Sequence, residues 1–308
     1  MAVVLMGFVL VPLLVLVVGS TVERLVSLTR TRGLDRSVRA RSLLASGATL
    51  VAGVAAMGAW VAVGENPASD VRVATLPALG GAVATLAGAV AELTWPHPAG
   101  TVRTASLDAR RLAPSLLQRL LGLGLAASAA ALVVGTLTAG PDGRSVTRSA
   151  GDASSTASPY PGATYAVPVG IALVVLGAAA WWAVRRVEAR PALPGGSPEL
   201  DRAVRQESQV RVLRPAATGA LLTAAGLWLT LGPAVNRVTQ NLRMASEDAP
   251  RSPGDWVQWL GFAGAGLGVL LALAAGVALF WVGPGLPRPA RPAHPVAEAT
   301  RGASGGAA

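Results

Sequence analysis

Hydrophobic and polar residues follow one another in long blocks along this chain. Seven apolar runs are close to the length of roughly 20 residues that a helix needs to cross a hydrocarbon core of about 30 Å. They cover residues 2–20, 43–63, 73–95, 117–139, 164–184, 215–235 and 257–282, with bounds good to a few residues. Helices of a soluble bundle would need a polar face, and these runs have none. The pattern predicts an all-α, polytopic integral membrane protein with seven transmembrane helices.

The positions of the arginines predict the orientation of these spans. The segments 23–41, 96–119, 185–214 and 283–308 carry 20 of the 26 basic residues, and the loops 64–72, 140–163 and 236–256 carry 6. The two sets alternate around the seven spans, so the positive-inside rule predicts an N-terminus outside and a C-terminus inside. The net charge of +10 then lies on the cytoplasmic face. There it would meet anionic lipid headgroups and not nucleic acid.

Composition agrees with a membrane protein. Hydrophobic residues make up 52% of the chain and charged residues 14%, against about 25% charged residues in soluble proteins. The chain has no cysteine, which excludes disulfides, thiol nucleophiles and cysteine-bound metals.

The chain divides into a transmembrane domain, 1–282, and a Pro/Gly/Ala-rich tail, 283–308, expected to be a disordered cytoplasmic segment. The first run lacks a preceding basic region and is followed by arginine, so we expect an uncleaved anchor and not a signal peptide. The outer loop 140–163 is rich in Ser, Thr, Gly and Pro and is expected to be mobile. Its end, Tyr160-Pro161-Gly162, is typical of a turn leading into the fifth span.

The largest cytoplasmic segment contains a helix start at Ser197-Pro198-Glu199. Leu200 and Val204 would share one face, which leaves Arg202 and Arg205 toward water or headgroups. This pattern predicts an amphipathic helix lying at the membrane interface. Docking of another protein is the alternative.

Tryptophans gather near the predicted ends of the spans, where an indole has one wet and one apolar side. The expected interface anchors are Trp95, Trp181, Trp182, Trp256, Trp259 and Trp281, with Trp60 near another end. Trp228 is the exception and falls within the sixth span.

In the last predicted span a small residue recurs every fourth position: Gly264, Gly268, Ala272 and Gly276. Small residues let helix backbones approach closely in lipid. The face is interpreted as helix packing within the chain. Homo-oligomerisation, or docking to a membrane-protein partner, is the alternative.

Candidate chemistry concentrates in 92–112, where Glu92, His97, Ser106 and Asp108 lie close in sequence. The chain's two histidines lie outside the spans, and neither has a second histidine at metal-ligand spacing. We therefore expect no catalytic, metal or cofactor site, and interpret this stretch as a turn at the membrane interface. The arginine three positions before Ser106 makes that serine a candidate phosphorylation site.

Two short motifs carry a resemblance. The stretch Glu92-Leu93-Thr94-Trp95-Pro96 with Gly100 and Val102-Arg103, and the later Tyr160-Pro161-Gly162-Ala163-Thr164-Tyr165, resemble uncharacterised multi-pass membrane proteins of high-GC Actinobacteria. The resemblance implies a multi-pass protein of an actinobacterial plasma membrane. It brings no known activity and no binding residues.

The expected function follows from the missing catalytic groups, the small-residue helix faces and the basic cytoplasmic surface. It is a non-enzymatic membrane component, a scaffold or regulatory partner in a cell-envelope or cell-division complex. The alternative is a transporter or channel-like protein for weakly charged or apolar cargo, since several predicted spans contain proline.

Overall fold

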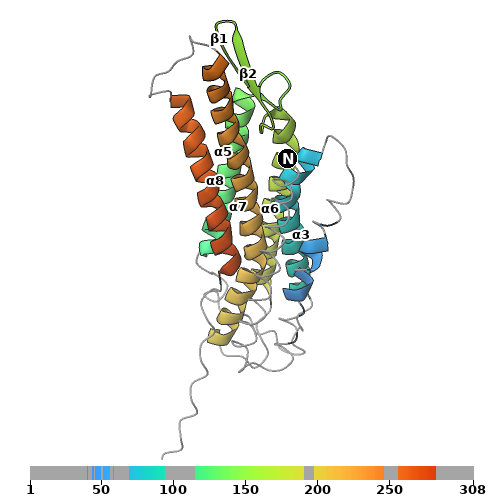
Figure 1. Cartoon of the computed structure of the whole chain (residues 1–308). Helices are drawn as coiled ribbons and strands as arrows, with labels where there is room; N and C mark the ends of the chain where they lie inside the picture. Colours follow the sequence, from blue (N-terminus) through green and yellow to red (C-terminus); the bar gives the residue numbers. More distant parts are fainter. Residues whose placement is uncertain are drawn as a thin grey trace, which may run out of the picture.

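The computed structural model describes residues 69–93, 115–190, 198–245 and 256–281, together with short helical pieces between residues 40 and 58. Five helices in this part of the chain are long and apolar enough to cross a membrane. They are α3 (Ser69–Leu93), α5 (Leu116–Thr138), α6 (Ala163–Ala189), α7 (Pro198–Ala245) and α8 (Trp256–Phe280), with a hairpin of β1 (Val146–Ala150) and β2 (Ala153–Ala157) between α5 and α6. Figure 1 shows them as one elongated bundle.

These helices coincide with the last five predicted spans, so the prediction of a helical membrane protein is confirmed at this level. The predicted span 2–20 and the tail 283–308 lie outside the described residues, and the predicted span 43–63 is described only in part, as short helical pieces.

Helix α7 is the central element of the bundle and packs against α3, α5, α6 and α8. It has 48 residues. At 1.5 Å per residue it is about 72 Å long, more than twice the hydrocarbon thickness of about 30 Å. It is therefore longer than a membrane span, and Figure 1 shows it running the whole length of the bundle. Its N-terminal arm carries charged residues, and its C-terminal end supports the hairpin.

The prediction of a separate interfacial helix in 185–214 is wrong. The helix does begin at Pro198, but it continues into the sixth span without a break. Pro215 does not end it. Val204 is buried, as is most of the arm beyond it, because α3 and α6 pack against α7.

Helices α3 and α7 cross through a reciprocal pair of Pro-x-x-x-Gly segments. A Cβ added to Gly81 of α3 would lie 2.8 Å from the Pro215 carbonyl oxygen, and one added to Gly219 of α7 would lie 2.5 Å from the Pro77 carbonyl oxygen. Real side chains do not approach backbone atoms this closely, so only glycine fits at both positions. The crossing brings the two backbones into direct contact, as small residues do in membrane bundles.

The buried face of α8 follows a different spacing from the predicted one. Gly264 and Gly268 do lie against α7, where added Cβ atoms would be 3.2 Å from the Trp228 ring and 2.7 Å from Leu229. Ala272 is partly buried, and Gly276 has nothing within 4 Å of an added Cβ. A four-residue step turns a helix about 40° too far at 3.6 residues per turn, so the predicted row drifts off the contact. The buried face instead contains Gly261, Gly264, Gly268, Leu271, Ala275, Ala278 and Leu279.

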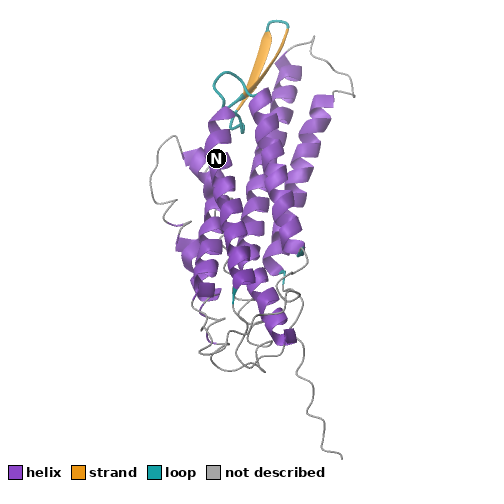
Figure 2. Cartoon of the chain, turned by 180° about the vertical axis from the view of Figure 1, so that it is seen from behind, coloured by secondary structure: helices purple, strands orange, loops and turns teal. Residues whose placement is uncertain are grey.

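The loop 140–163 forms an ordered hairpin and is not the mobile loop that the sequence suggested. Figure 2 shows its two strands at one end of the helical bundle. Thr147 pairs with Thr156 across the ladder, and Arg148 Nη1 donates to Thr239 Oγ1 of α7 at 3.1 Å. A two-stranded ribbon is marginal alone, so its contact with α7 stabilises it.

The turn before β1 is organised by Asp142. Its carboxylate accepts hydrogen bonds from the amide of Arg144 and from both the amide and hydroxyl of Ser145. These bonds, the Ser145 hydroxyl first, lower the pKa of Asp142 because they stabilise its ionised form. On the other side of the hairpin, the predicted turn at 160–162 leads into α6 at Ala163.

Candidate functional site: a buried ion-pair cluster

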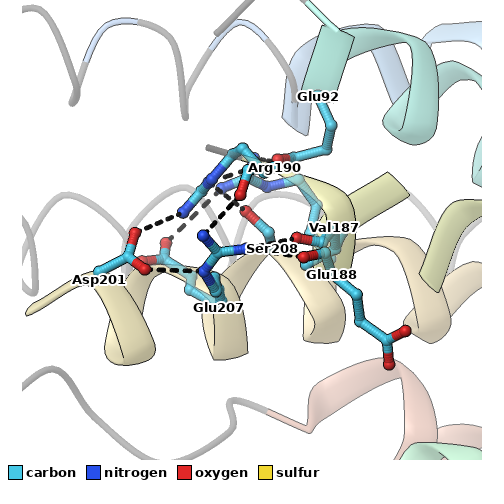
Figure 3. Close-up of polar contacts among 9 residues, drawn as sticks. Glu92, Val187, Glu188, Arg190, Asp201, Glu207 and Ser208 are labelled. Carbon is cyan, nitrogen blue, oxygen red and sulfur yellow. Dashed lines mark hydrogen bonds and ion pairs between the residues drawn. The ribbon is translucent and has the colours of Figure 1, made fainter. Parts of the chain in front are cut away.

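The most concentrated polar site in the described part of the chain lies where α3 and α6 end and α7 begins. Figure 3 shows acidic and basic side chains from these three elements pointing toward one another. The buried charged members are Glu92, Arg190, Asp201, Arg205 and Arg211. We call these five residues the inner cluster.

Glu92 joins the three elements. One of its carboxylate oxygens lies 3.5 Å from Arg190 Nη1 and the other 3.4 Å from Arg211 Nη1. Glu92 is 5% exposed. The chain brings it here from a helix end about a hundred residues away, which no local pattern could have indicated. Glu92 is therefore a bridge between two guanidinium groups and not part of a reactive turn.

Arg205 caps the end of α6. Its Nη1 donates to the carbonyls of Val187 and Glu188 at 3.1 Å, and its Nη2 donates to the carbonyl of Arg190 at 2.6 Å. Its Nε donates to Asp201 at 2.8 Å. The last carbonyls of a helix have no partner within the helix, and a cation at this end also complements the helix dipole. The prediction that Arg205 faces water or headgroups is wrong, since its side chain is fully buried.

Arg190 connects the two acidic groups. Its Nη2 lies 3.7 Å from Asp201, and its Nη1 also donates to the hydroxyl of Ser208 at 3.5 Å. Burial lowers the pKa of Arg190 from its ordinary value, and the carboxylate of Glu92 opposes that shift. An arginine keeps its proton at physiological pH even so.

The inner cluster contains three arginines and two acids. A third acid, Glu207, lies 3.8 Å from Arg211 with a side chain 29% exposed, so the charges nearly balance. Buried charges are tolerated when they are paired and hydrogen-bonded. Removing one member therefore leaves an uncompensated charge, which makes the cluster sensitive to single substitutions.

Tryptophans place the cluster relative to the apolar band. Trp256 and Trp259 lie at the start of α8 and Trp281 directly after its end, so Trp259 and Trp281 are 22 residues apart. That spacing corresponds to about 33 Å of helix, close to the hydrocarbon thickness. Arg214 of α7 donates to the Trp281 carbonyl at 2.6 Å, which places Arg214 at the edge of the band.

The cluster extends away from that edge. Along α7, Arg211 lies about 5 Å and Arg205 about 14 Å before Arg214, at 1.5 Å per residue. The two residues are therefore beyond the apolar band and are buried by protein. Trp181 and Trp182 of α6 lie toward the same end of the bundle.

Several residues singled out in the sequence lie outside the described residues: Trp60, Trp95, His97, Ser106 and Asp108. Within the described residues, no three His, Asp or Glu side chains gather in a way that could hold a metal ion. The inner cluster itself holds its carboxylates against guanidinium groups, an arrangement typical of structural ion pairs.

Part of this site could have been found in the sequence. Asp201 and Arg205, like Glu207 and Arg211, are spaced four residues apart, the spacing that brings oppositely charged side chains together on a helix. The contribution of α3 and α6 has no such local signal. No protein-family model, no curated protein and no solved structure matches this chain.

Proposed function

We propose that the chain is a non-enzymatic membrane component, a scaffold or regulatory partner in a cell-envelope or cell-division complex. The observation that supports this most directly is the construction of α7. One continuous helix connects the outer hairpin, through Thr239, with the inner cluster, through Arg205 and its neighbours. A rigid element with ordered polar features at both ends suits a protein that presents fixed surfaces on the two sides of a membrane.

We also propose seven spans, an N-terminus outside and a C-terminus inside. The arginine asymmetry of the sequence supports this orientation, and the relative direction of the described helices supports the alternation of the spans. At one end of the bundle, the start of α7 meets Glu92 near the end of α3 and Arg190 after α6. Helices α3 and α6 therefore run opposite to α7.

The orientation can be tested with single cysteines because the chain has none. Ser149 in the hairpin and Arg202 in the N-terminal arm of α7 are both exposed. We expect Ser149→Cys to react with an impermeant maleimide in intact cells, and Arg202→Cys to react only after permeabilisation. The reverse pattern would overturn the orientation.

The partner role is tested by photo-crosslinking in the native host from the same two positions. A lipid-facing position, Leu270, is the control because its side chain is 64% exposed on an apolar helix surface. We expect one or more membrane proteins to be captured reproducibly from Ser149 or Arg202 and not from Leu270. A chain that stays monomeric and captures no membrane protein from either position contradicts the proposal.

Transport of weakly charged or apolar cargo is the alternative. Prolines do lie inside α3, α6 and α7. However, the prolines at the α3–α7 crossing face glycines with no room for an additional methyl group. Helix interfaces this tight favour a fixed scaffold over a passage between these helices. Substrate-dependent flux in liposomes containing the purified chain would favour the transporter instead.

A further inference from the structure

Helix α6 carries a continuous exposed stripe that ends in a cationic group. The stripe contains Val167, Ile171, Val174, Ala178, Trp181 and Arg185, all of them exposed. Their spacing alternates between four and three residues, which keeps them on one face of a helix. An exposed apolar stripe on a spanning helix is the surface that acyl chains cover.

The end of the stripe falls at the level of the headgroups. From Ala163, where α6 begins, to Trp181 the helix rises about 27 Å, close to the hydrocarbon thickness. Trp181 is 64% exposed, as expected for an interfacial indole. Arg185 lies one turn further, about 6 Å along the axis, within the polar layer of a bilayer.

Two arginines at this level are held in the same way. The guanidinium carbon of Arg185 lies 5.6 Å from the Trp181 ring centroid, and that of Arg186 lies 5.1 Å from the Trp182 ring centroid. Stacking on an aromatic face restrains the side chain and leaves the N–H groups at the guanidinium edge available. Within the described residues, neither arginine forms a hydrogen bond or an ion pair.

These features distinguish the pair from the other arginines at this end of the bundle. Arg190, Arg205 and Arg211 are buried and occupied by carboxylates or carbonyls. Arg119 and Arg202 are exposed but do not stack on an indole of the described part. Two guanidinium groups on consecutive residues, each with an available edge, can each bind phosphate oxygens, which arginine binds in a bidentate manner.

We propose that Arg185 and Arg186, each stacked on the indole one turn earlier, form a binding site for the phosphate of an anionic phospholipid. The headgroup would lie at the two guanidinium groups, and an acyl chain would follow the apolar stripe that ends at Trp181. This site requires α6 to cross a bilayer. It requires neither the scaffold role nor a particular orientation.

The test measures lipid binding to the purified full chain by native mass spectrometry in mild detergent. The probes are phosphatidylglycerol, which is anionic, and phosphatidylcholine, which is zwitterionic. We expect the double variant R185Q/R186Q to bind phosphatidylglycerol roughly 20- to 30-fold more weakly, since each direct guanidinium–phosphate contact at an exposed site contributes about fivefold and the control arginines make no such contact. Phosphatidylcholine binding should be unchanged.

The matched control is R119Q/R202Q, which removes two exposed arginines from the same end of the bundle. We expect its affinity for phosphatidylglycerol to fall less than fivefold. The variant R185K/R186K keeps both charges. The thermal unfolding midpoints of R185K/R186K and R185Q/R186Q, each compared with that of the unmodified chain, show whether each variant is folded. We expect R185K/R186K to retain more binding than R185Q/R186Q.

Three results would overturn the site. Unchanged phosphatidylglycerol binding in a folded R185Q/R186Q variant shows that the pair does not bind the lipid. An equal loss in R119Q/R202Q shows that total surface charge is responsible. Displacement of the lipid by an equimolar amount of glycerol phosphate shows a soluble-anion site. The scaffold proposal survives all three results, because it is tested separately by crosslinking from Ser149 and Arg202.

Discussion

Arg205 allows the capping of α6 to be tested with one substitution. The Arg205→Met variant keeps a long side chain but removes the four hydrogen bonds to Asp201 and to three carbonyls of the α6 end. Because the side chain is fully buried, solvent does not screen these contacts. Breaking a buried ion pair by removing one partner costs about 3–5 kcal/mol.

The estimate stays below the sum of four charge-assisted hydrogen bonds, which at about 1.5–3 kcal/mol each would be larger. Asp201 retains Arg190 at 3.7 Å, and water can reach carbonyls at a helix end once the guanidinium is gone. Applying roughly 2–4 °C per kcal/mol for a chain of this size, the unfolding midpoint should fall by about 6–20 °C. The assay is thermal unfolding in mild detergent, followed by circular dichroism.

The matched control is Arg202→Met. Arg202 lies three residues earlier in the same helix and is exposed, so its loss should change stability by no more than about 0.5 kcal/mol. Arg205→Lys should be intermediate, because one ammonium cannot reach all the acceptors of a guanidinium. Amide exchange at residues 187–190 should accelerate in Arg205→Met and not in Arg202→Met. Equal stability of the two methionine variants would refute the capping role.

Three further predictions concern the rest of the bundle. Gly219→Ala should destabilise the chain by about 1–3 kcal/mol through overpacking against the Pro77 carbonyl, whereas Gly276→Ala, with open space around it, should be neutral in the same unfolding assay. Trp228→Phe should cost about 1 kcal/mol, because it removes the indole hydrogen bond to a backbone carbonyl of α5; no loss would show that the bond is not needed. The pKa of Asp142 is lower in the folded chain than in the unfolded chain. The stabilisation that Asp142 gives to the turn before the hairpin is therefore complete above the unfolded pKa, and it is lost as pH falls through the folded pKa. The protection factors of the hairpin amides, which compare observed with intrinsic exchange at the same pH, should therefore fall in strong acid. Asp142→Asn should show the lower protection already at neutral pH, with little further change in acid.

The helical class and the apolar part of each of the five described helices could be predicted from the sequence. The length of each apolar run matches the thickness of a hydrocarbon core. This match is a property of the run itself, so its position can be found without knowing which helices pack against it. The tryptophans of α6 and α8 follow from the same local rule, since an indole prefers the interface wherever the helix reaches it. The start of α7 at Pro198 was also local, because proline is favoured in the first turn.

The environment of each arginine depends on tertiary packing and could not be read from its neighbours in the sequence. Arg202 and Arg205 are both polar positions on one helix, yet the first is exposed and the second is fully buried. Likewise, Gly268 and Gly276 share one sequence spacing, yet only Gly268 contacts α7. The physical reason is that burial depends on which distant helix lies opposite. That partner is set by the crossing of α3, α6 and α8 with α7 and not by the residues on either side in the chain.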